Sequence, residues 1–297
     1  MSVEVDKILN DNQSGSVTLT QNTLLLYREF LNEKSMAGLK LDEIFDQFQD
    51  LSKKILKKQP NMVLLRKSTN NILIYFKRLV KSEKQVDQII KAVEKKIISI
   101  EQDIEARVKK IANTGSKIIA PTNKIMTISN STLVKKILDT AHNQRRKFEV
   151  YCCKSHPPDE GVNLAETLDK SGIKTTLISD SQMGVFMQGM NLVLIGADRI
   201  YDNGFVNKAG TLALCLTAKY FNIPVYLAAD TSKILLESER IIKLVSHNKV
   251  EVYGGNRKKL SVENVYYEKI PIELIHKVIC EDSVFDTVDF INWYLKE

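Results

Sequence analysis

The first part of the chain, up to about residue 115, carries apolar residues at the three- and four-residue spacings of amphipathic helices. Polar breaks around residues 33–42, 57–62 and 81–84 divide it into several helices. Ser82 and Gln85 form a candidate capping box before the longest apolar stripe, and Gly115 follows the stripe as a stop signal. The stripe consists of Val86, Ile89, Val93, Ile97, Ile100, Ile104, Val108 and Ile111. We expect it to pack within an N-terminal helical bundle, with a coiled-coil partner as the alternative.

From about residue 116 the pattern changes to short, β-branched apolar runs that alternate with helical stretches. The expected buried strands are Lys124–Ile128, Phe148–Cys153, Thr175–Ser179, Leu192–Ile195 and Val225–Ala229. The expected crossover helices are Thr132–His142, Asn163–Ser171, Gln182–Met190 and Lys208–Phe221. This alternation predicts repeated βαβ units and therefore a parallel sheet. The expected fold is α/β, with an N-terminal helical domain over residues 1–115 and a Rossmann-like domain over residues 116–297.

Composition narrows the class of protein. With 297 residues, 43% hydrophobic and 27% charged, the chain is globular and long enough for a substantial core, which excludes a disulfide-stapled miniprotein and a disordered chain. No apolar run approaches the length that spans a bilayer, and the acidic, amide-rich start is unlike a signal peptide. We therefore expect a cytosolic protein without a membrane partner.

The cysteines and the net charge exclude further functions. Cys152, Cys153, Cys215 and Cys280 form no C-x-x-C pair and no zinc-like spacing with histidine, so we expect buried, reduced thiols, no metal site and no cofactor. The net charge of +7 comes from lysines spread along the chain. This distribution favours a solvated lysine surface over a nucleic-acid-binding face.

In an open parallel sheet, ligands bind beyond the carboxyl ends of the strands, so the residues after each strand are the candidates for chemistry. Ser129 and Ser131 follow the first strand and lead into a helix, whose first N–H groups favour a phosphate or a carboxylate. An ordinary N-cap is the alternative for either serine. After the second strand, His156 can contact an anion or transfer a proton, or simply be exposed, and Glu160 with Gly161 can equally mark a helix start.

The most informative polar residues follow the fourth strand. Asp198 comes after a buried strand and a small-residue turn, where a carboxylate can lose water and act as a base. Asn207 and Lys208 offer an amide and an ammonium group to a phosphate at the next helix start. The alternative is a tight turn at Asn203-Gly204 beside a surface ion pair of Asp198 and Arg199.

These residues resemble the initiation factor 2B alpha/beta/delta regulatory subunits, whose fold is shared with methylthioribose-1-phosphate isomerase and ribose-1,5-bisphosphate isomerase. The resemblance covers most of the chain. It rests chiefly on Ile195–Ile200, Asn203-Gly204, Asn207–Thr211, Ala218-Lys219 and Ile223–Ala229. It is supported by Gly15-Ser16, Ile125–Val134, Pro157 with Glu160-Gly161, Ile178–Ser181 and the Tyr266–Asp282 segment with Pro271–Ile275.

The resemblance implies roles for several residues. The isomerases use a cysteine and an aspartate as their catalytic pair; Asp198 matches the aspartate, whereas Ser129 stands at the cysteine position. A serine hydroxyl is a far weaker acid than a thiol and needs an adjacent base, and none is evident from the sequence. His156 replaces the arginine of a phosphate-binding Arg-Pro loop, which should weaken phosphate binding. Arg66 matches the arginine of a degraded Arg-Pro-Thr motif, or is simply a helix-surface charge.

The retained Asp198, Asn207 and Lys208, beside the lost thiol and arginine, indicate a pocket that binds a phosphorylated ligand without turnover. We expect a nucleoside monophosphate or a sugar phosphate, with Ser131 and Glu160 among the binding residues. The resemblance also implies a dimer interface in the second domain, a homodimer or larger assembly, and initiation factor two or related subunits as partners. Alternatives are a divergent aldose–ketose isomerase of a ribose 1-phosphate derivative, with Asp198 as base, and a basic RNA-associated assembly protein.

Overall fold

The computed structural model describes residues 2–82, 85–201, 203–235, 245–281 and 283–294. The chain separates into two compact units, Met1–Arg107 and Val108–Glu297. The boundary lies inside one long helix, α5 (Val86–Ser116), whose last turns belong to the second unit. Among the described helices, none is both long enough and apolar enough to cross a membrane.

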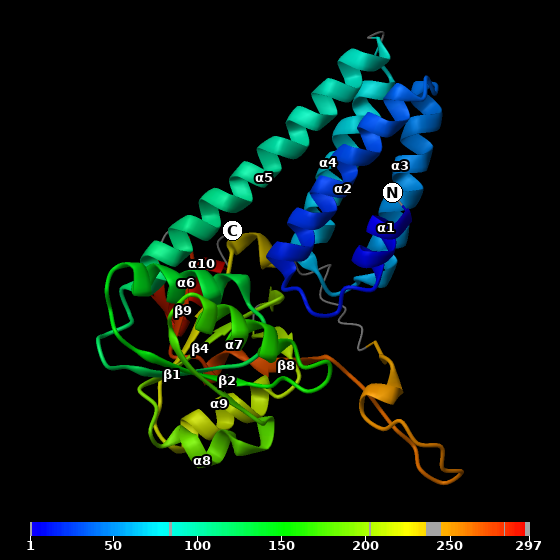
Figure 1. The fold of residues 1–297 in the computed structure, drawn as a ribbon. Helices are drawn as coiled ribbons and strands as arrows, with labels where there is room; N and C mark the ends of the chain where they lie inside the picture. Colours follow the sequence, from blue (N-terminus) through cyan, green and yellow to red (C-terminus); the bar gives the residue numbers. More distant parts are fainter. Residues whose placement is uncertain (1, 83–84, 202, 236–244, 282, 295–297) are drawn as a thin grey trace. The chain divides into compact units, whose positions relative to one another are not determined.

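The first unit is helical, as the apolar spacing predicts. Before α5 it contains α1 (Ser2–Leu9), α2 (Ser16–Met36), α3 (Leu41–Lys58) and α4 (Val63–Val80), and the helices change at the predicted polar breaks (Figure 1). The apolar stripe of α5 is buried, from Ile89 to Ile111. The predicted capping box is wrong: α5 begins at Val86, and the Ser82 hydroxyl donates to the Leu79 carbonyl at the end of α4.

The core of the helical unit is aromatic. Phe48 on α3 is fully buried, and its ring centroid lies 4.7 Å from that of Tyr27 on α2 and 5.7 Å from that of Phe76 on α4. Phe30 on α2 also contacts it, at 6.0 Å between centroids. One side chain therefore joins three helices, because only a large ring reaches all of them at helix-packing distance.

The second unit is built on a seven-stranded sheet in the order β10-β9-β7-β4-β1-β2-β3. All neighbouring pairs are parallel except β10 and β9. The strands are β1 (Lys124–Thr127), β2 (Glu149–Cys153), β3 (Lys174–Ile178), β4 (Leu192–Gly196), β7 (Val225–Ala228), β9 (Lys277–Ile279) and β10 (Val284–Asp286). The five strands predicted from the sequence are all present, so the α/β fold with a parallel sheet is confirmed.

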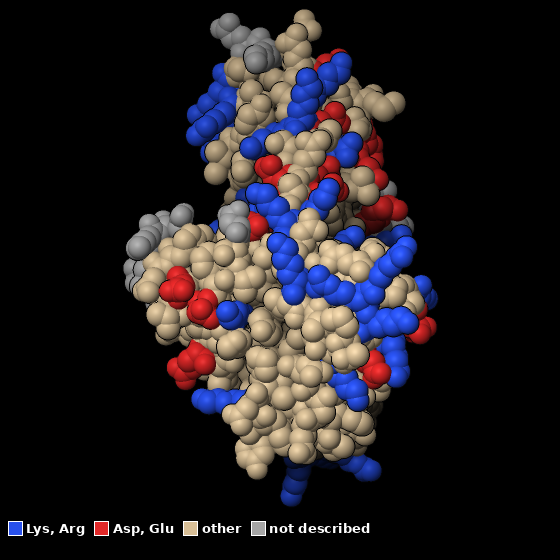
Figure 2. All heavy atoms as spheres, turned by 90° about the vertical axis from the view of Figure 1, so that its left-hand side faces the viewer, with Lys and Arg blue, Asp and Glu red and all other residues tan. Residues whose placement is uncertain are grey.

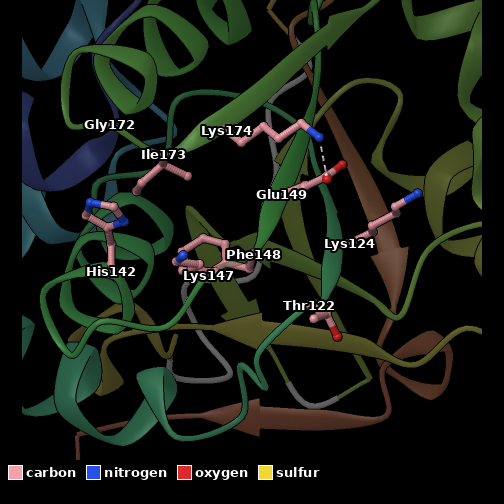
Figure 3. Close-up of a pocket in the computed structure, with 9 residues that line it drawn as sticks. All are labelled: Thr122, Lys124, His142, Lys147, Phe148, Glu149, Gly172, Ile173 and Lys174. Carbon is pink, nitrogen blue, oxygen red and sulfur yellow. Dashed lines mark hydrogen bonds and ion pairs between the residues drawn. The ribbon is translucent and has the colours of Figure 1, made fainter.

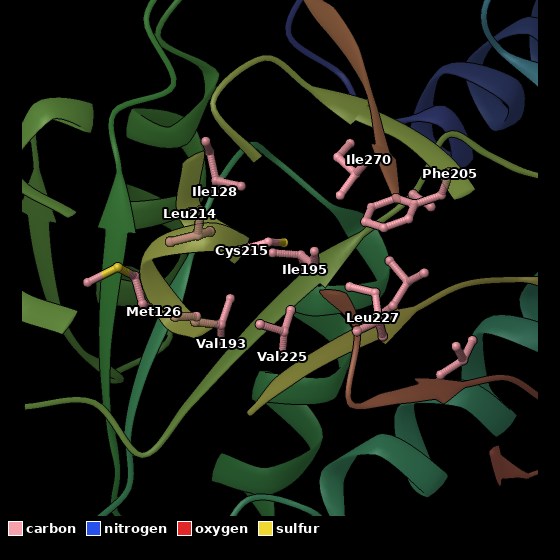
Figure 4. Packing of buried hydrophobic residues seen from close by; sticks show 14 of the residues in the cluster. Met126, Ile128, Val193, Ile195, Phe205, Leu214, Cys215, Val225, Leu227 and Ile270 are labelled. Carbon is pink, nitrogen blue, oxygen red and sulfur yellow. The ribbon is translucent and has the colours of Figure 1, made fainter. Parts of the chain in front are cut away.

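Helices cover both faces of this sheet (Figure 1). α6 (Thr132–Asn143) and α7 (Glu160–Lys170) lie on one side, and α8 (Met183–Met187) and α9 (Thr211–Tyr220) lie on the other. Phe290 of α10 (Thr287–Tyr294) belongs to the same core cluster as Leu214 and Cys215 of α9. The core between sheet and helices is mainly aliphatic, with Val193, Ile195 and Leu227 of the central strands against Leu214 and Cys215 of α9 (Figure 4). Burial on both faces explains why these strands are continuously apolar.

A second, three-stranded antiparallel sheet was not predicted. It contains β5 (Arg199–Tyr201), β6 (Gly204–Lys208) and β8 (Tyr267–Pro271), in the order β5-β6-β8. Lys208 is therefore the last residue of a strand, and the helix predicted to begin at Lys208 begins instead at Thr211, after Gly210 with a left-handed φ of 100°. Asp282, at the end of the late segment that supports the family resemblance, lies outside the described residues.

We predict that Phe48→Ala destabilises the protein by roughly 3–5 kcal/mol, because it removes a ring that joins three helices and leaves a cavity. Leu25→Ala on α2 is the matched control; Leu25 is 51% exposed, and its truncation should cost less than about 1 kcal/mol. Urea unfolding followed by circular dichroism measures both. Equal losses in the two variants would contradict the aromatic core.

Candidate functional site

The segment after β1 places Ser129 in a strained conformation. Ser129 has a left-handed φ of 72°, which is uncommon for a residue other than glycine. Its backbone N–H donates to the Ser155 hydroxyl at 2.7 Å, and its own hydroxyl donates to Glu160 Oε1 at 3.1 Å. The serine at the family cysteine position therefore has a carboxylate as its hydrogen-bond partner. The expectation that no base lies beside it is wrong, because Glu160 comes from the next crossover.

Glu160 is held at this place by the first turn of α7. It is the first residue of the helix and is 5% exposed. The next residue, Gly161, packs directly against the end of β2, since a Cβ there would lie 1.9 Å from the Cys153 carbonyl oxygen. Only glycine permits this approach, so Gly161 sets how closely Glu160 sits to the strand ends.

Glu160 forms a buried ion pair with Lys208. Glu160 Oε2 lies 3.2 Å from Lys208 Nζ, and the two side chains are 6% and 3% exposed. The ammonium group also donates to the Pro157 carbonyl and lies 4.6 Å from the centre of the Tyr266 ring. Burial raises the pKa of Glu160 to about 7 and lowers the pKa of Lys208, although each charge favours the other.

The Tyr266 ring is held by a stacked histidine and by a hydrogen bond from its hydroxyl. His247 stacks on it with ring centroids 3.6 Å apart and planes inclined by 8°, and the hydroxyl donates to Glu251 Oε2 at 2.5 Å. Burial and the neighbouring Glu251 raise the pKa of Tyr266. Sequence reasoning missed Tyr266, His247 and Glu251, because they are some forty residues or more beyond Lys208 in the chain and follow no strand end of the main sheet.

The loop that carries His156 is held by an aspartate. The backbone N–H groups of Ser155 and His156 donate to the two carboxylate oxygens of Asp180, at 2.8 and 2.7 Å. The His156 ring is half exposed, and its Nδ1 lies 2.6 Å from Asp159 Oδ1. Asp180 is thus a positioning residue that the sequence reasoning did not single out; its place directly after β3 is the signal that points to it.

Asp198 lies beyond β4, where its backbone N–H donates to the Val206 carbonyl at 2.9 Å. Loss of water around the carboxylate raises the pKa of Asp198, and the charges of Lys233, Arg199 and Lys208 oppose the shift. Lys233 is 4% exposed and donates to the Ala197 carbonyl at 2.6 Å. A carboxyl group with a raised pKa beside buried cations is suited to accept and return a proton.

The remaining predicted binding residues have protein partners. Asn207 is buried, and its side-chain amide donates to the Thr211 hydroxyl at 3.0 Å. The first N–H groups of α9 donate to a carboxylate of the protein itself: Gly210 and Leu212 both bond Glu268 Oε1 at 2.8 Å. The anion site expected at this helix start is therefore occupied by Glu268.

Two further predicted residues lie apart from the ion pair. Ser131 caps α6, accepting a hydrogen bond from the Val134 N–H at 3.4 Å, so the N-cap alternative is confirmed for this serine. Arg66 lies in the first turn of α4, in the helical unit, and its placement in a phosphate site stays a prediction. The described residues contain no cluster of histidine, cysteine, aspartate and glutamate side chains that fits a metal ion.

The structure thus joins Ser129, Glu160 and Lys208 by direct contacts, and places the His156 loop beside them through Ser155 and Pro157. The site also contains two carboxyl groups with raised pKa, Glu160 and Asp198. The residues 12–287 match the model of the initiation factor 2 subunit family. The chain belongs to this family.

Relatives of this family member include two different kinds of protein. A Pyrococcus horikoshii protein named eIF-2B subunit 2-like is 29% identical over 81% of this chain and 82% of its own. A ribose 1,5-bisphosphate isomerase of Methanocaldococcus jannaschii is 27% identical over 88% of this chain and 83% of its own. Membership of the family is therefore compatible with both a translation factor and an isomerase.

Solved structures show the same fold. The Pyrococcus horikoshii translation initiation factor eIF-2B has a TM-score of 0.79 at 24% identity, covering 98% of both chains. The 5-methylthioribose 1-phosphate isomerase of the same organism has a TM-score of 0.81 at 19% identity, covering 98% of this chain and 87% of its own. A chain of the tetrameric eIF2B-beta2-delta2 complex from C. thermophilum has a TM-score of 0.67 at 17% identity, covering 99% of this chain and 93% of its own.

We predict that Gly161→Ala destabilises the protein by about 1–3 kcal/mol or more, because the added methyl group overlaps the Cys153 carbonyl and displaces the start of α7. Gly184→Ala in α8 is the control, since nothing lies within 4 Å of its added Cβ and alanine favours a helix. Thermal unfolding compares the two. A Gly161→Ala protein as stable as the Gly184→Ala protein would contradict the close packing.

The raised pKa of Glu160 predicts a pH dependence of stability. Its folded pKa of about 7 exceeds the ordinary value of 4.5, so the protein is relatively more stable below pH 4.5 and loses this contribution as the pH rises through 7. The loss is on the order of 3 kcal/mol. The measurement is the free energy of unfolding from urea titrations between pH 4.5 and 7.5, for the native protein and for Glu160→Gln. The native protein should lose stability relative to the variant across this range; a constant difference would contradict the assignment.

Proposed function

We propose that the α/β unit binds a small phosphorylated molecule, a sugar phosphate or a nucleoside monophosphate, beyond the carboxyl ends of β1, β2 and β4, without converting it. The observation that carries this is the chain of contacts from Ser129 to Glu160 and from Glu160 to Lys208, which joins the segments after β1 and β2 to the end of β6. Family relatives named as sugar-phosphate isomerases support the class of ligand. The exposed His156 ring at the rim supplies a further donor to an anion.

The proposed absence of turnover rests on Ser129, which stands where the isomerases have a cysteine. The pKa of a serine hydroxyl lies far above that of cysteine, so Ser129 supplies a proton to an intermediate poorly. Lys208 already forms an ion pair with Glu160 and donates to the Pro157 carbonyl. A ligand phosphate therefore has to compete with an internal carboxylate, which favours reversible binding of modest affinity.

A second candidate function is a divergent isomerase of a ribose 1-phosphate derivative. The observation that favours it is the hydrogen bond from the Ser129 hydroxyl to Glu160, whose pKa of about 7 suits proton transfer near neutral pH. In this function the bond between C1 and the ring oxygen breaks as Glu160, through Ser129, gives a proton to the ring oxygen. Asp198 moves the C2 proton to C1, and the C2 hydroxyl returns a proton to Glu160 as it becomes the ketone. The two functions differ only in whether the bound sugar phosphate is converted.

We infer that the protein also assembles, as a homodimer or with related subunits. The α/β unit exposes large apolar side chains on β3, α8 and α9: Leu177, Val185, Leu216 and Tyr220 are 46–81% exposed. The part of this unit visible in Figure 2 presents a broad area with few charged side chains. Large exposed apolar side chains are a feature of protein–protein interfaces. The tetrameric complex among the solved relatives supports assembly of this fold.

Phosphorus NMR tests binding and conversion together. We predict that ribose-1,5-bisphosphate, methylthioribose-1-phosphate or a nucleoside monophosphate shows broadened or shifted resonances with the purified protein and no new product resonance. His156→Ala should weaken binding by about tenfold, because it removes an exposed donor to the phosphate. His276→Ala is the matched control. His276 is an exposed histidine of the same unit that directly precedes β9, away from the carboxyl ends of the strands.

New product resonances would replace the proposed function by the second candidate. Loss of those resonances in Asp198→Asn and Glu160→Gln would then assign the proton transfers. Unchanged ligand signals with all four compounds, AMP and GMP included, would contradict ligand binding at this site altogether.

A further inference from the structure

A second concave site lies at the amino ends of the strands of the main sheet, where β1, β2 and β3 begin. It is a cavity of about 590 Å³, within the range of small-molecule sites. Its lining residues are Thr122, Lys124, His142, Lys147, Phe148, Glu149, Gly172, Ile173 and Lys174 (Figure 3). A strand of five residues spans about 17 Å, so the length of the strands separates this cavity from the site of Glu160 and Lys208.

The first residues of the three strands form a charged row across the sheet. Lys124, Glu149 and Lys174 are register partners in the parallel pairs of β1 with β2 and of β2 with β3. Lys174 Nζ lies 2.6 Å from Glu149 Oε1, and this hydrogen bond lowers the pKa of Glu149 and raises that of Lys174. The one carboxylate among the described lining residues is thus already engaged.

Two lysines of the cavity make no ion pair at contact distance, although the charge of Lys124 also acts on Glu149. The ammonium groups of Lys124 and Lys147 have no hydrogen-bond or ion-pair partner in the part of the chain that the structure describes, and the same holds for the ring of His142. Gly172 leaves the His142 ring edge uncovered: a Cβ at Gly172 would lie 3.6 Å from His142 Nε2. The cavity therefore presents three lysines and an imidazole to a ligand, against a single carboxylate.

The floor between these polar groups is apolar. Phe148 and Ile173 line the cavity and are only 6% and 2% exposed, so their side chains present a small hydrophobic surface inside a cationic rim. A lysine ammonium is a compact point charge that binds phosphate groups, and an apolar floor accepts a sugar or base ring.

We propose that this cavity binds a small phosphate ester, whose phosphate contacts Lys147, whose negative charge Lys124 also attracts from the other side of the cavity, and whose ring lies over Phe148 and Ile173 (Figure 3). The site is separate from the one under the proposed function and does not depend on it. No residue of one site lines the other among those described, so each site can bind or fail to bind by itself.

Histidine signals distinguish the two sites in one titration. The chain has four histidines, of which His142 lines the new cavity. His156 and His247 belong to the site of Ser129, Glu160 and Lys208, called the carboxyl-end site below. The ring proton signals of the full-length protein are followed by NMR as AMP is added, with inorganic phosphate as a second probe. His142→Gln and His156→Gln assign the signals. We expect the His142 signal to shift saturably with AMP, and more weakly with phosphate, which lacks the ring.

The double variant Lys124→Gln with Lys147→Gln should weaken the AMP-dependent shift of His142 by at least about tenfold. The matched control is Lys136→Gln with Lys219→Gln, which removes two exposed lysines of α6 and α9 outside the cavity and should leave the shift unchanged. Folding of both variants is checked by the dispersion of the remaining signals. A His142 signal that does not move, or that moves equally in both double variants, overturns the proposal. A shift of His156 without His142 supports only the carboxyl-end site, and a shift of His142 without His156 supports only the new cavity.

Discussion

The buried ion pair of Glu160 and Lys208 is the contact on which the arrangement of the carboxyl-end site depends. It joins the start of α7, which follows the main sheet's β2, to the end of β6 in the small antiparallel sheet. Truncating either side chain leaves the other without its buried hydrogen-bond partner, which costs about 1–3 kcal/mol. The pair therefore keeps the two sheets in one relative position, and with them the polar residues that each sheet supplies.

The same pair determines the chemistry of the site. Because Lys208 already forms an ion pair with Glu160 and contacts the Tyr266 ring, its charge is not simply open to a ligand. Burial raises the pKa of Glu160 to about 7, and the Ser129 hydroxyl donates to this carboxyl group. Glu268 has a similar part at the start of α9, where it bonds the backbone N–H groups that an external anion would otherwise use. Internal carboxylates thus hold the Lys208 ammonium group and the first N–H groups of α9, the groups for which the proposed phosphate ligand has to compete.

Much of the fold follows from local patterns. The stripe from Val86 to Ile111 makes α5 amphipathic whatever its surroundings, and the continuous apolar runs of β1, β4 and β7 suit only strands that are covered on both faces. The small sheet escaped prediction because β5 and β6 are short and polar at their ends, and because β8 pairs with β6 from a distant part of the chain. Lys208 shows the consequence: its neighbours suggest a helix start, whereas pairing with Tyr267 makes it a strand residue.

The sequence by itself determined the helical first unit and the alternation of parallel strands and helices in the second, because hydrophobic periodicity acts over short stretches of chain. It also pointed to the segments after the strands, where Ser129, Glu160 and Asp198 lie, because ligands of open parallel sheets bind beyond the carboxyl ends of the strands. The tertiary structure alone decided that Glu160 lies beside both Ser129 and Lys208. It also decided that His247 stacks on Tyr266, whose ring the Lys208 ammonium group contacts. It placed Lys124, Glu149 and Lys174 in one row. These contacts join residues from separate crossovers. Their partners, burial and pKa shifts depend on how the elements pack, and packing at that range leaves no periodic trace in the sequence.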